Sequence, residues 1–173
     1  MCKVSVIIPT LWKAKKFIDH LVNVLISDES VGEIIIVDND PTDFFYNDKK
    51  VVTLKQRENL YVNPSWNLGI EKSSKIEDLL VEDIGLIGLD ESSIIKIENF
   101  DNEMITYLDR KIELKSINTR NWGFGMVIAG HIKSYHKIPE NIRIWCGDDY
   151  LFQMNSRVGK VNYVIDDIPI YTK

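Results

Sequence analysis

Val4-Ser5-Val6-Ile7-Ile8 is a short run of mostly β-branched residues that stops at Pro9-Thr10. A second run, Glu33-Ile34-Ile35-Ile36-Val37, ends on Asp38-Asn39-Asp40. Because both runs lack the alternation of a half-buried strand, they predict strands that are buried on both faces of a parallel sheet. Ligands of open α/β sheets bind at the carboxyl ends of the strands. The acidic and amide residues there therefore predict a site for a nucleobase or ribose.

The composition is that of an ordinary globular protein of one domain. The chain has 173 residues, 45% of them hydrophobic, and a net charge of −5, which gives no electrostatic footprint for nucleic acid. Cys2 and Cys146 form neither a disulfide framework nor a metal-binding spacing, as expected in a reducing compartment. No apolar stretch approaches the roughly 18 residues of a membrane span, and no signal peptide is evident. We therefore expect a cytoplasmic protein without a membrane span.

The first half of the chain alternates between predicted strands and helices. Strands are expected over about residues 3–8, 33–37 and 51–54, and helices over about 13–28 and from Pro64 onward. Pro64 favours the first turn of a helix, and Asn63 is a good N-cap. This alternation predicts right-handed β-α-β crossovers in a mainly parallel sheet flanked by helices, an α/β fold in a single domain.

The second half carries fewer clear elements. Residues 84–89 predict a strand that ends on Asp90-Glu91, whereas residues 76–81 fit either a strand or the end of the preceding helix. A helix is expected over about 98–108, followed by closing strands over 161–165 and 168–171.

Acidic residues recur where predicted strands end or helices begin. The three clusters are Asp38-Asn39-Asp40, Asp90-Glu91 and Asp148-Asp149. Each alone is explained by helix capping and the helix dipole. Three of them at one edge of a small sheet would concentrate negative charge, which a cation or a substrate would offset.

These motifs occur in the order seen in family 2 glycosyltransferases of the GT-A fold, and the chain resembles that family over nearly its whole length. The resemblance rests on four segments: residues 4–10, residues 33–39, Asn59-Leu60 through Asn67-Leu68-Gly69, and Trp145 through Leu151. It implies a minimal GT-A domain over residues 1–173. It also implies a nucleotide-diphospho-sugar donor and transfer to a hydroxyl acceptor with inversion at the anomeric carbon.

The resemblance assigns the donor to residues of about 1–95. It implies that Pro9 and Thr10 line the base and ribose pocket, that Asp38 accepts a hydrogen bond from the base, and that Asn39 lies beside it. Asn67 would open the helix next to the donor, although local capping also explains an amide there. A UDP-sugar is the favoured donor.

The family's metal-binding acidic pair follows the fourth strand, and there the sequence departs from the pattern. Asp90-Glu91-Ser92 has an apolar strand before it, but its third position is Ser92. We expect Asp90 to be the metal ligand, with Asp83 as the alternative that better fits the spacing. Mn²⁺ or Mg²⁺ would be the cofactor, since hard cations bind carboxylate and phosphate oxygens.

The acceptor side is assigned to residues of about 96–173. By resemblance Asp149 is the general base and Asp148 positions the acceptor, with exchanged roles as the alternative. Such a base must lie within hydrogen-bond reach of the attacking hydroxyl. Trp122 and Trp145 would form a platform for a saccharide acceptor, or pack in the core.

Two other functions remain open. The incomplete Asp90-Glu91-Ser92 motif is compatible with a relative that binds nucleotide or sugar without efficient transfer. A nucleotidyltransferase also gathers acidic residues around a metal, but it usually carries a glycine-rich loop after its first strand. The segment Thr10-Leu11-Trp12-Lys13 contains no glycine, which argues against that class.

Overall fold

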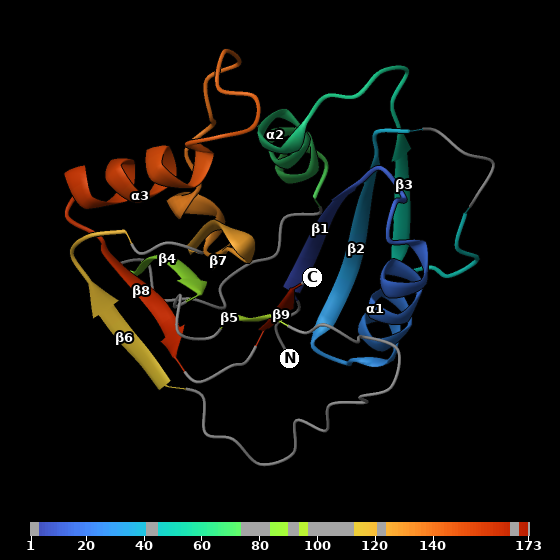
Figure 1. The fold of residues 1–173 in the computed structure, drawn as a ribbon, viewed down its shortest axis with the longest axis horizontal. Coiled ribbons are helices and arrows are strands. Elements are labelled where there is room, and N and C mark those ends of the chain that lie inside the picture. Colours follow the sequence, from blue (N-terminus) through green and yellow to red (C-terminus); the bar gives the residue numbers. More distant parts are fainter. Residues whose placement is uncertain are drawn as a thin grey trace. The chain divides into compact units, whose positions relative to one another are not determined.

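A computed structural model gives the fold, and it describes residues 4–40, 45–73, 84–89, 94–96, 113–120, 124–166 and 170–172. Over these residues the protein is a mixed α/β structure with a parallel three-stranded sheet and three α-helices (Figure 1). The chain divides into two compact units. Unit 1 comprises Met1–Leu79 and Lys137–Gly147, and unit 2 comprises Leu80–His136 and Asp148–Lys173.

Unit 1 is built on the predicted parallel sheet. Its strands are β1 (Val4–Thr10), β2 (Val31–Asp38) and β3 (Val51–Lys55), with β2 in the middle. Both strand pairs are parallel, which confirms the sequence prediction for this sheet. The first strand does not stop at Pro9 as predicted, because Pro9 pairs with Val37 in register. A proline is tolerated there since β1 is an edge strand among the described residues.

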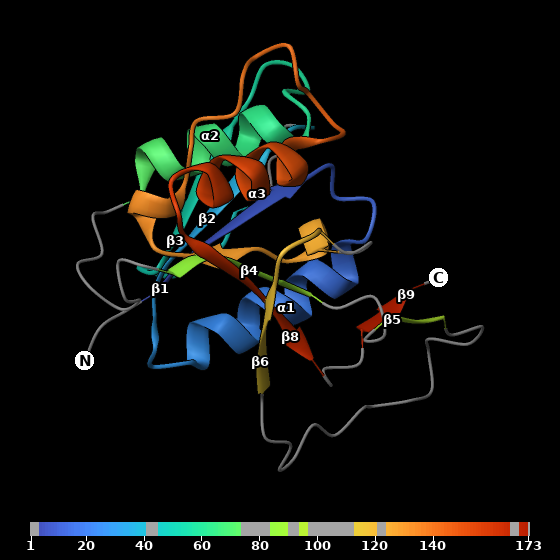
Figure 2. The ribbon, with the colours of Figure 1, turned by 90° about the vertical axis from the view of Figure 1, so that its left-hand side faces the viewer.

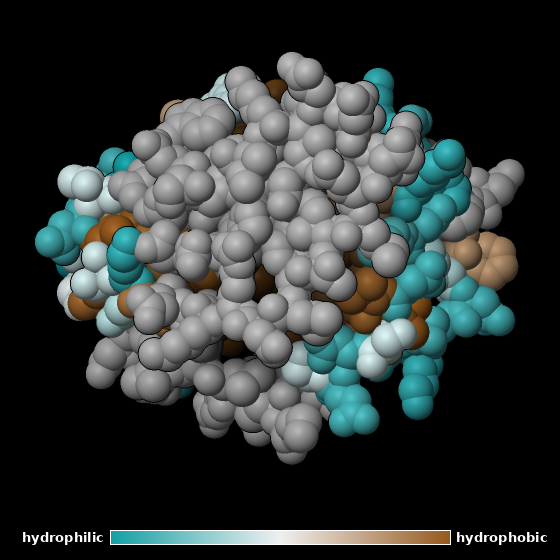
Figure 3. All heavy atoms as spheres, turned by 60° about the horizontal axis from the view of Figure 1, so that its bottom comes forward, coloured by the Kyte–Doolittle hydropathy of each residue, from teal (hydrophilic) through white to brown (hydrophobic). Residues whose placement is uncertain are grey.

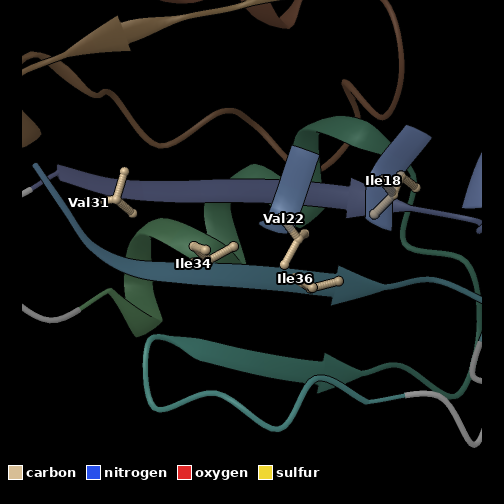
Figure 4. Close-up of a cluster of buried hydrophobic side chains, with 5 residues drawn as sticks. All are labelled: Ile18, Val22, Val31, Ile34 and Ile36. Carbon is tan, nitrogen blue, oxygen red and sulfur yellow. The ribbon is translucent and has the colours of Figure 1, made fainter. Parts of the chain in front are cut away.

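Helices α1 (Lys15–Ser27) and α2 (Val62–Lys72) cover opposite faces of this sheet (Figure 2). On one face, side chains of α1 pack on β2 in a cluster of five buried residues, Ile18, Val22, Val31, Ile34 and Ile36 (Figure 4). On the other face α2 approaches β1 so closely that a Cβ on Gly69 would lie 2.3 Å from Cγ2 of Ile7. In β2, where residues 34–38 are all buried, burial on both faces is the physical reason for the continuous apolar run. The same prediction for β1 is not met, because this edge strand is half-buried over residues 5–9.

The start of α2 differs from the sequence prediction. The helix begins at Val62 after Tyr61, whose φ is 66°, so Asn63 is not the N-cap. Asn63 lies within the first turn and is 1% exposed. Its backbone N–H donates to the carbonyl of Arg143 (3.0 Å) and its Nδ2 donates to the carbonyl of Ile142 (3.0 Å). The amide therefore fastens another segment of unit 1 instead of capping its own helix.

Unit 2 holds a mixed sheet with the strand order β6-β8-β4-β7. The predicted strands are present as β4 (Ile84–Leu89) and β8 (Val161–Asp166), which pair in parallel. The antiparallel strands β6 (Glu113–Ile117) and β7 (Ala129–Gly130) were not predicted. A separate pair, β5 (Ile94–Lys96) and β9 (Ile170–Thr172), is parallel. Short 3₁₀ turns occur at Phe124–Met126 and Ile132–Ser134.

Helix α3 (Gly147–Arg157) packs in unit 2 through Leu151 and Phe152, which are both buried. Phe152 meets the fully buried Phe124 edge to face, with ring centroids 5.4 Å apart. Phe124 lies so close to Gly88 of β4 that a Cβ there would come within 2.3 Å of its ring. These contacts anchor α3 to the core of unit 2.

Where Figure 3 draws the surface in colour, hydrophobic residues are exposed between hydrophilic ones. Within the described ranges, no helix has the length and apolar character needed to cross a membrane. The elements predicted over residues 76–81 and 98–108 lie outside the described residues.

Candidate functional site

The carboxyl edge of the unit 1 sheet brings together the residues that end β1 and β2. Thr10 and Asp38 are partners in the parallel register. The N–H of Asn39 donates to the carbonyl of Thr10 (2.9 Å), and the N–H of Gln56 donates to the carbonyl of Asp38 (2.9 Å). Thr10, Asp38 and Asn39, three polar residues of the predicted site, are thus held together at one edge of the sheet.

Asp38 is fully buried at this edge, and the protein itself supplies its hydrogen-bond donors. Its Oδ1 accepts from the indole Nε1 of Trp12 (2.7 Å) and from the backbone N–H of Asp40 (3.2 Å). The hydroxyl of Thr10 accepts from the backbone N–H of Trp12 (2.8 Å). The side chains predicted to read a nucleobase are therefore adjacent, and Trp12 engages both of them.

Trp12 is supported from the loop before β3. Its ring lies beside Tyr46, with centroids 6.4 Å apart, and the Tyr46 hydroxyl donates to Oδ1 of Asp19 (2.7 Å). The pKa of the Tyr46 hydroxyl is raised well above its ordinary value, mainly by burial and to a smaller extent by the hydrogen bond to Asp19. Hydrogen bonds from Lys15 first and Tyr46 second hold the pKa of Asp19 below its ordinary value of 3.8. The neutral Tyr46 is therefore a stable donor at physiological pH.

Asn39 and Pro9 take structural positions at the same edge. Asn39 is 6% exposed; its Nδ2 donates to the hydroxyl of Ser65 (2.9 Å) and its Oδ1 accepts from the N–H of Leu60 (3.0 Å). Asn39 thereby ties the end of β2 to the entry of α2. Pro9 lies inside β1, so its contribution to a pocket would come from the strand and not from a loop.

The prediction that Asn67 opens its helix is wrong, because α2 begins at Val62. Its amide instead forms a pair of hydrogen bonds with the backbone of Ile138. Nδ2 donates to the carbonyl (2.9 Å), and the N–H of Ile138 donates to Oδ1 (3.0 Å). Ile138 is fully buried and lies in neither a helix nor a strand. Asn67 therefore acts as a clamp that holds the backbone of this irregular segment.

Asp148 and Asp149 occupy the first turn of α3, which confirms the predicted helix start. A residue that the sequence reasoning did not consider, Arg120, binds both carboxylates. Its Nη1 lies 3.0 Å from Oδ2 of Asp148, and its Nε donates to Oδ1 of Asp149. One guanidinium thus offsets part of the repulsion between neighbouring carboxylates. Arg120 follows the unpredicted strand β6, so no local signal pointed to it.

Asp148 also depends on a glycine. A Cβ on Gly125 would lie 2.5 Å from Oδ2 and 2.7 Å from Cβ of Asp148, so the aspartate packs directly against that backbone. Next to the pair is an open hollow of about 350 Å³, lined by Asn118, Thr119, Arg120, Asp149, Phe152 and Gln153. Amide and hydroxyl side chains around a carboxylate are the groups that bind a polyhydroxylated compound.

The remaining predicted residues divide between exposed and undescribed. Trp145 is 82% exposed, so it is not a core residue. Cys146 beside it is a free, exposed thiol with a φ of 64°. Trp122, Asp90 and Asp83 lie outside the described residues. In the part of the chain that is described, no three His, Cys, Asp or Glu side chains are grouped to hold a metal ion.

Two groups of residues are therefore the candidates for a functional site, one in each unit. The first is Thr10, Trp12 and Asp38 at the sheet edge, and the second is Arg120, Asp148 and Asp149 at the start of α3. No protein-family model and no curated protein matches the chain.

Proposed function

We propose that the protein is an inverting glycosyltransferase of the GT-A type, which transfers a sugar from a nucleotide-diphospho-sugar to a hydroxyl of a saccharide or similar acceptor. One observation carries the proposal. Thr10 and Asp38 are register partners at the carboxyl edge of a parallel sheet, where open α/β sheets bind ligands. A carboxylate at that edge accepts hydrogen bonds and does not donate them, which suits the N–H groups of a nucleobase.

In the proposed reaction the acceptor oxygen attacks the anomeric carbon. The new C–O bond forms as the bond from that carbon to the diphosphate breaks, and the nucleoside diphosphate leaves with the electron pair. The hydroxyl proton passes to Asp149, the proposed general base. Asp148 would orient the acceptor, and Arg120 holds both carboxylates in the first turn of α3.

A divalent cation, Mn²⁺ or Mg²⁺, would offset the charge of the diphosphate leaving group. We assign its protein ligand to Asp90, with Asp83 as the alternative. The metal dependence is tested by adding EDTA to the binding and transfer assays. Loss of donor affinity in Asp90→Ala but not Asp83→Ala would support the assignment, and the reverse result would move the site to Asp83.

A second function is favoured by one contact. Arg120 donates to the Oδ1 atom of Asp149, and an oxygen engaged by a guanidinium is less available to take a proton. A protein that binds nucleotide-sugar without efficient transfer is the alternative that this contact supports. Donor binding without release of nucleoside diphosphate, over a panel of saccharide acceptors, would favour this second function.

The donor site is tested by calorimetry with UDP-, GDP- and dTDP-sugars, with and without Mn²⁺. Asp38→Asn keeps the shape of the side chain and removes its charge, so donor binding should weaken by about 1–3 kcal/mol. Asp28→Asn is the matched control, because Asp28 is an exposed carboxylate just before the amino end of β2. Equal donor affinity in the two variants would remove Asp38 from the site.

A further inference from the structure

The carboxylate of Asp38 is closed off by an aromatic side chain. Asp38 is fully buried, and the indole N–H of Trp12 donates to its Oδ1 at 2.7 Å. A base that approached Asp38 would meet Trp12 at the same oxygen. Trp12 therefore has to be accounted for in any binding of a base by this edge.

The backbone at Trp12 is in a conformation that a bulky residue adopts only when its surroundings impose it. Its φ is 57°, in the left-handed region that favours glycine. The surroundings that impose it are the bond from its N–H to the Thr10 hydroxyl (2.8 Å), the bond to Asp38, and the adjacent ring of Tyr46. The bond from the indole to Asp38 is one of these three contacts, so a ligand that replaced it would remove one restraint on this conformation.

The chemistry of the bond defines which ligand can take its place. A carboxylate accepts only, and the indole supplies a single ring N–H. The imide N–H of uracil or thymine is a donor of the same kind, as is the N1–H of guanine. Adenine and cytosine present an acceptor nitrogen at that ring position, which would leave the buried carboxylate facing a lone pair at a cost in affinity.

We propose that Trp12 is a displaceable cap on Asp38: its indole N–H satisfies the carboxylate in the empty protein, and a nucleobase with an imide-type ring N–H replaces it. This inference rests on the proposed nucleotide-binding function. It assigns to Trp12 a part in selecting the base. Tyr46 is the neighbouring ring of the capped state.

The substitution that isolates the cap is Trp12→Phe, which retains an aromatic ring and removes the N–H. According to the proposal, the bond between the indole and Asp38 exists only in the empty protein. Its removal therefore destabilises the empty protein alone, and UDP should bind about tenfold more tightly. Trp66→Phe is the control, because Trp66 lies in α2 of the same unit and is not one of the three residues Thr10, Trp12 and Asp38 that form the candidate site. Unchanged or weaker UDP binding in Trp12→Phe would overturn the cap.

A second measurement follows the indole directly. In protein labelled with ¹⁵N-tryptophan, the Trp12 indole signal, assigned by its absence in Trp12→Phe, should be protected from hydrogen exchange when no ligand is present. Saturating UDP should remove the protection, whereas ADP at the same concentration should leave it unchanged. If UDP binds and the signal stays protected, the cap is wrong while the proposed function stands. If neither protein binds UDP, GDP or dTDP, the proposed function fails and the cap fails with it.

Discussion

The Nη1 atom of Arg120 lies 3.0 Å from Oδ2 of Asp148, although the two residues are separated by 28 positions in the sequence (148 − 120). The same guanidinium donates to Asp149 through Nε. The three side chains are partly exposed, between 19% and 34%. This arrangement fixes both carboxylates in direction and leaves them partly exposed to solvent.

Arg120→Gln should loosen the acidic pair without unfolding the protein. The two carboxylates would repel each other once the cation is gone, so we expect a melting temperature a few degrees lower and a transfer rate about tenfold lower. UDP affinity should not change. The control is Arg157→Gln, an exposed arginine in the last turn of the same helix. If the transfer rate falls equally in both variants, the loss is not specific to Arg120. In that case Arg120→Lys should give no partial recovery of the transfer rate.

Asp149→Asn tests the general base. Removal of a general base typically lowers a rate by about 10²–10⁴-fold, and the amide preserves the shape of the side chain. Transfer is measured as nucleoside diphosphate released in the presence of saccharide acceptors, and UDP binding by calorimetry. We expect transfer to be lost and binding to be retained. A normal rate would make Asp149 a helix-start residue, and Asp148→Asn would then be the next variant to measure.

Gly125→Ala tests how closely Asp148 is packed. The added methyl group would lie 2.5 Å from Oδ2 of Asp148, so either the aspartate or the turn at Phe124–Met126 must move. Overpacking of this kind costs about 1–3 kcal/mol of unfolding free energy. In an Asp148→Gly background the clash is absent, and the same substitution should cost little. Additive losses in the double variant would mean that Gly125 acts through another neighbour.

The sheet of unit 1 could be predicted from sequence because its physical signal is local. Residues 34–37 are apolar at every position, and the structure shows why: they are at most 1% exposed and packed from both faces. The start of α3 could be predicted for a similar reason, because two adjacent acidic residues before an apolar segment complement the dipole of a helix.

The contacts that decide the site could not be predicted in this way. Arg120 reaches Asp148 through the antiparallel strand β6, and Trp12 reaches Asp38 through a left-handed backbone; neither has a periodic signature. For Asn67 a local sequence pattern was present, but it predicted the wrong role. Its position in an Asn-x-Gly segment predicted a helix start, whereas tertiary packing uses its amide to hold Ile138.

Asn67→Ala separates this clamp from a donor contact. Removal of the amide leaves the N–H and the carbonyl of the buried Ile138 without that partner, which should cost about 2–3 kcal/mol of unfolding free energy. UDP affinity, measured well below the melting temperature, should stay the same. Asn23→Ala, at an exposed position of α1, is the control. A tenfold loss of UDP affinity with unchanged stability would return Asn67 to the donor site.

The last prediction concerns acid stability beside the cap. Asp19 accepts hydrogen bonds from Lys15 and from Tyr46, both at 2.7 Å, and its pKa is lowered from 3.8 in the folded state. A carboxylate whose pKa is lower in the folded than in the unfolded protein stabilises the fold above the unfolded pKa. That contribution is lost as the pH falls through the folded value. Wild type should therefore melt about 1–3 °C above Asp19→Asn at about pH 6.

As the pH falls below 3.8 and towards the lowered pKa of folded Asp19, the difference between wild type and Asp19→Asn should shrink, because Asp19 takes up a proton and, like Asn, carries no charge. Glu29→Gln, which removes an exposed carboxylate beyond the end of α1, should melt close to wild type at both pH values. Thermal unfolding followed by circular dichroism gives all the values. A difference between wild type and Asp19→Asn that stays constant from pH 6 to pH 3 would mean that Asp19 supports Tyr46 through the shape of its side chain and not through its charge.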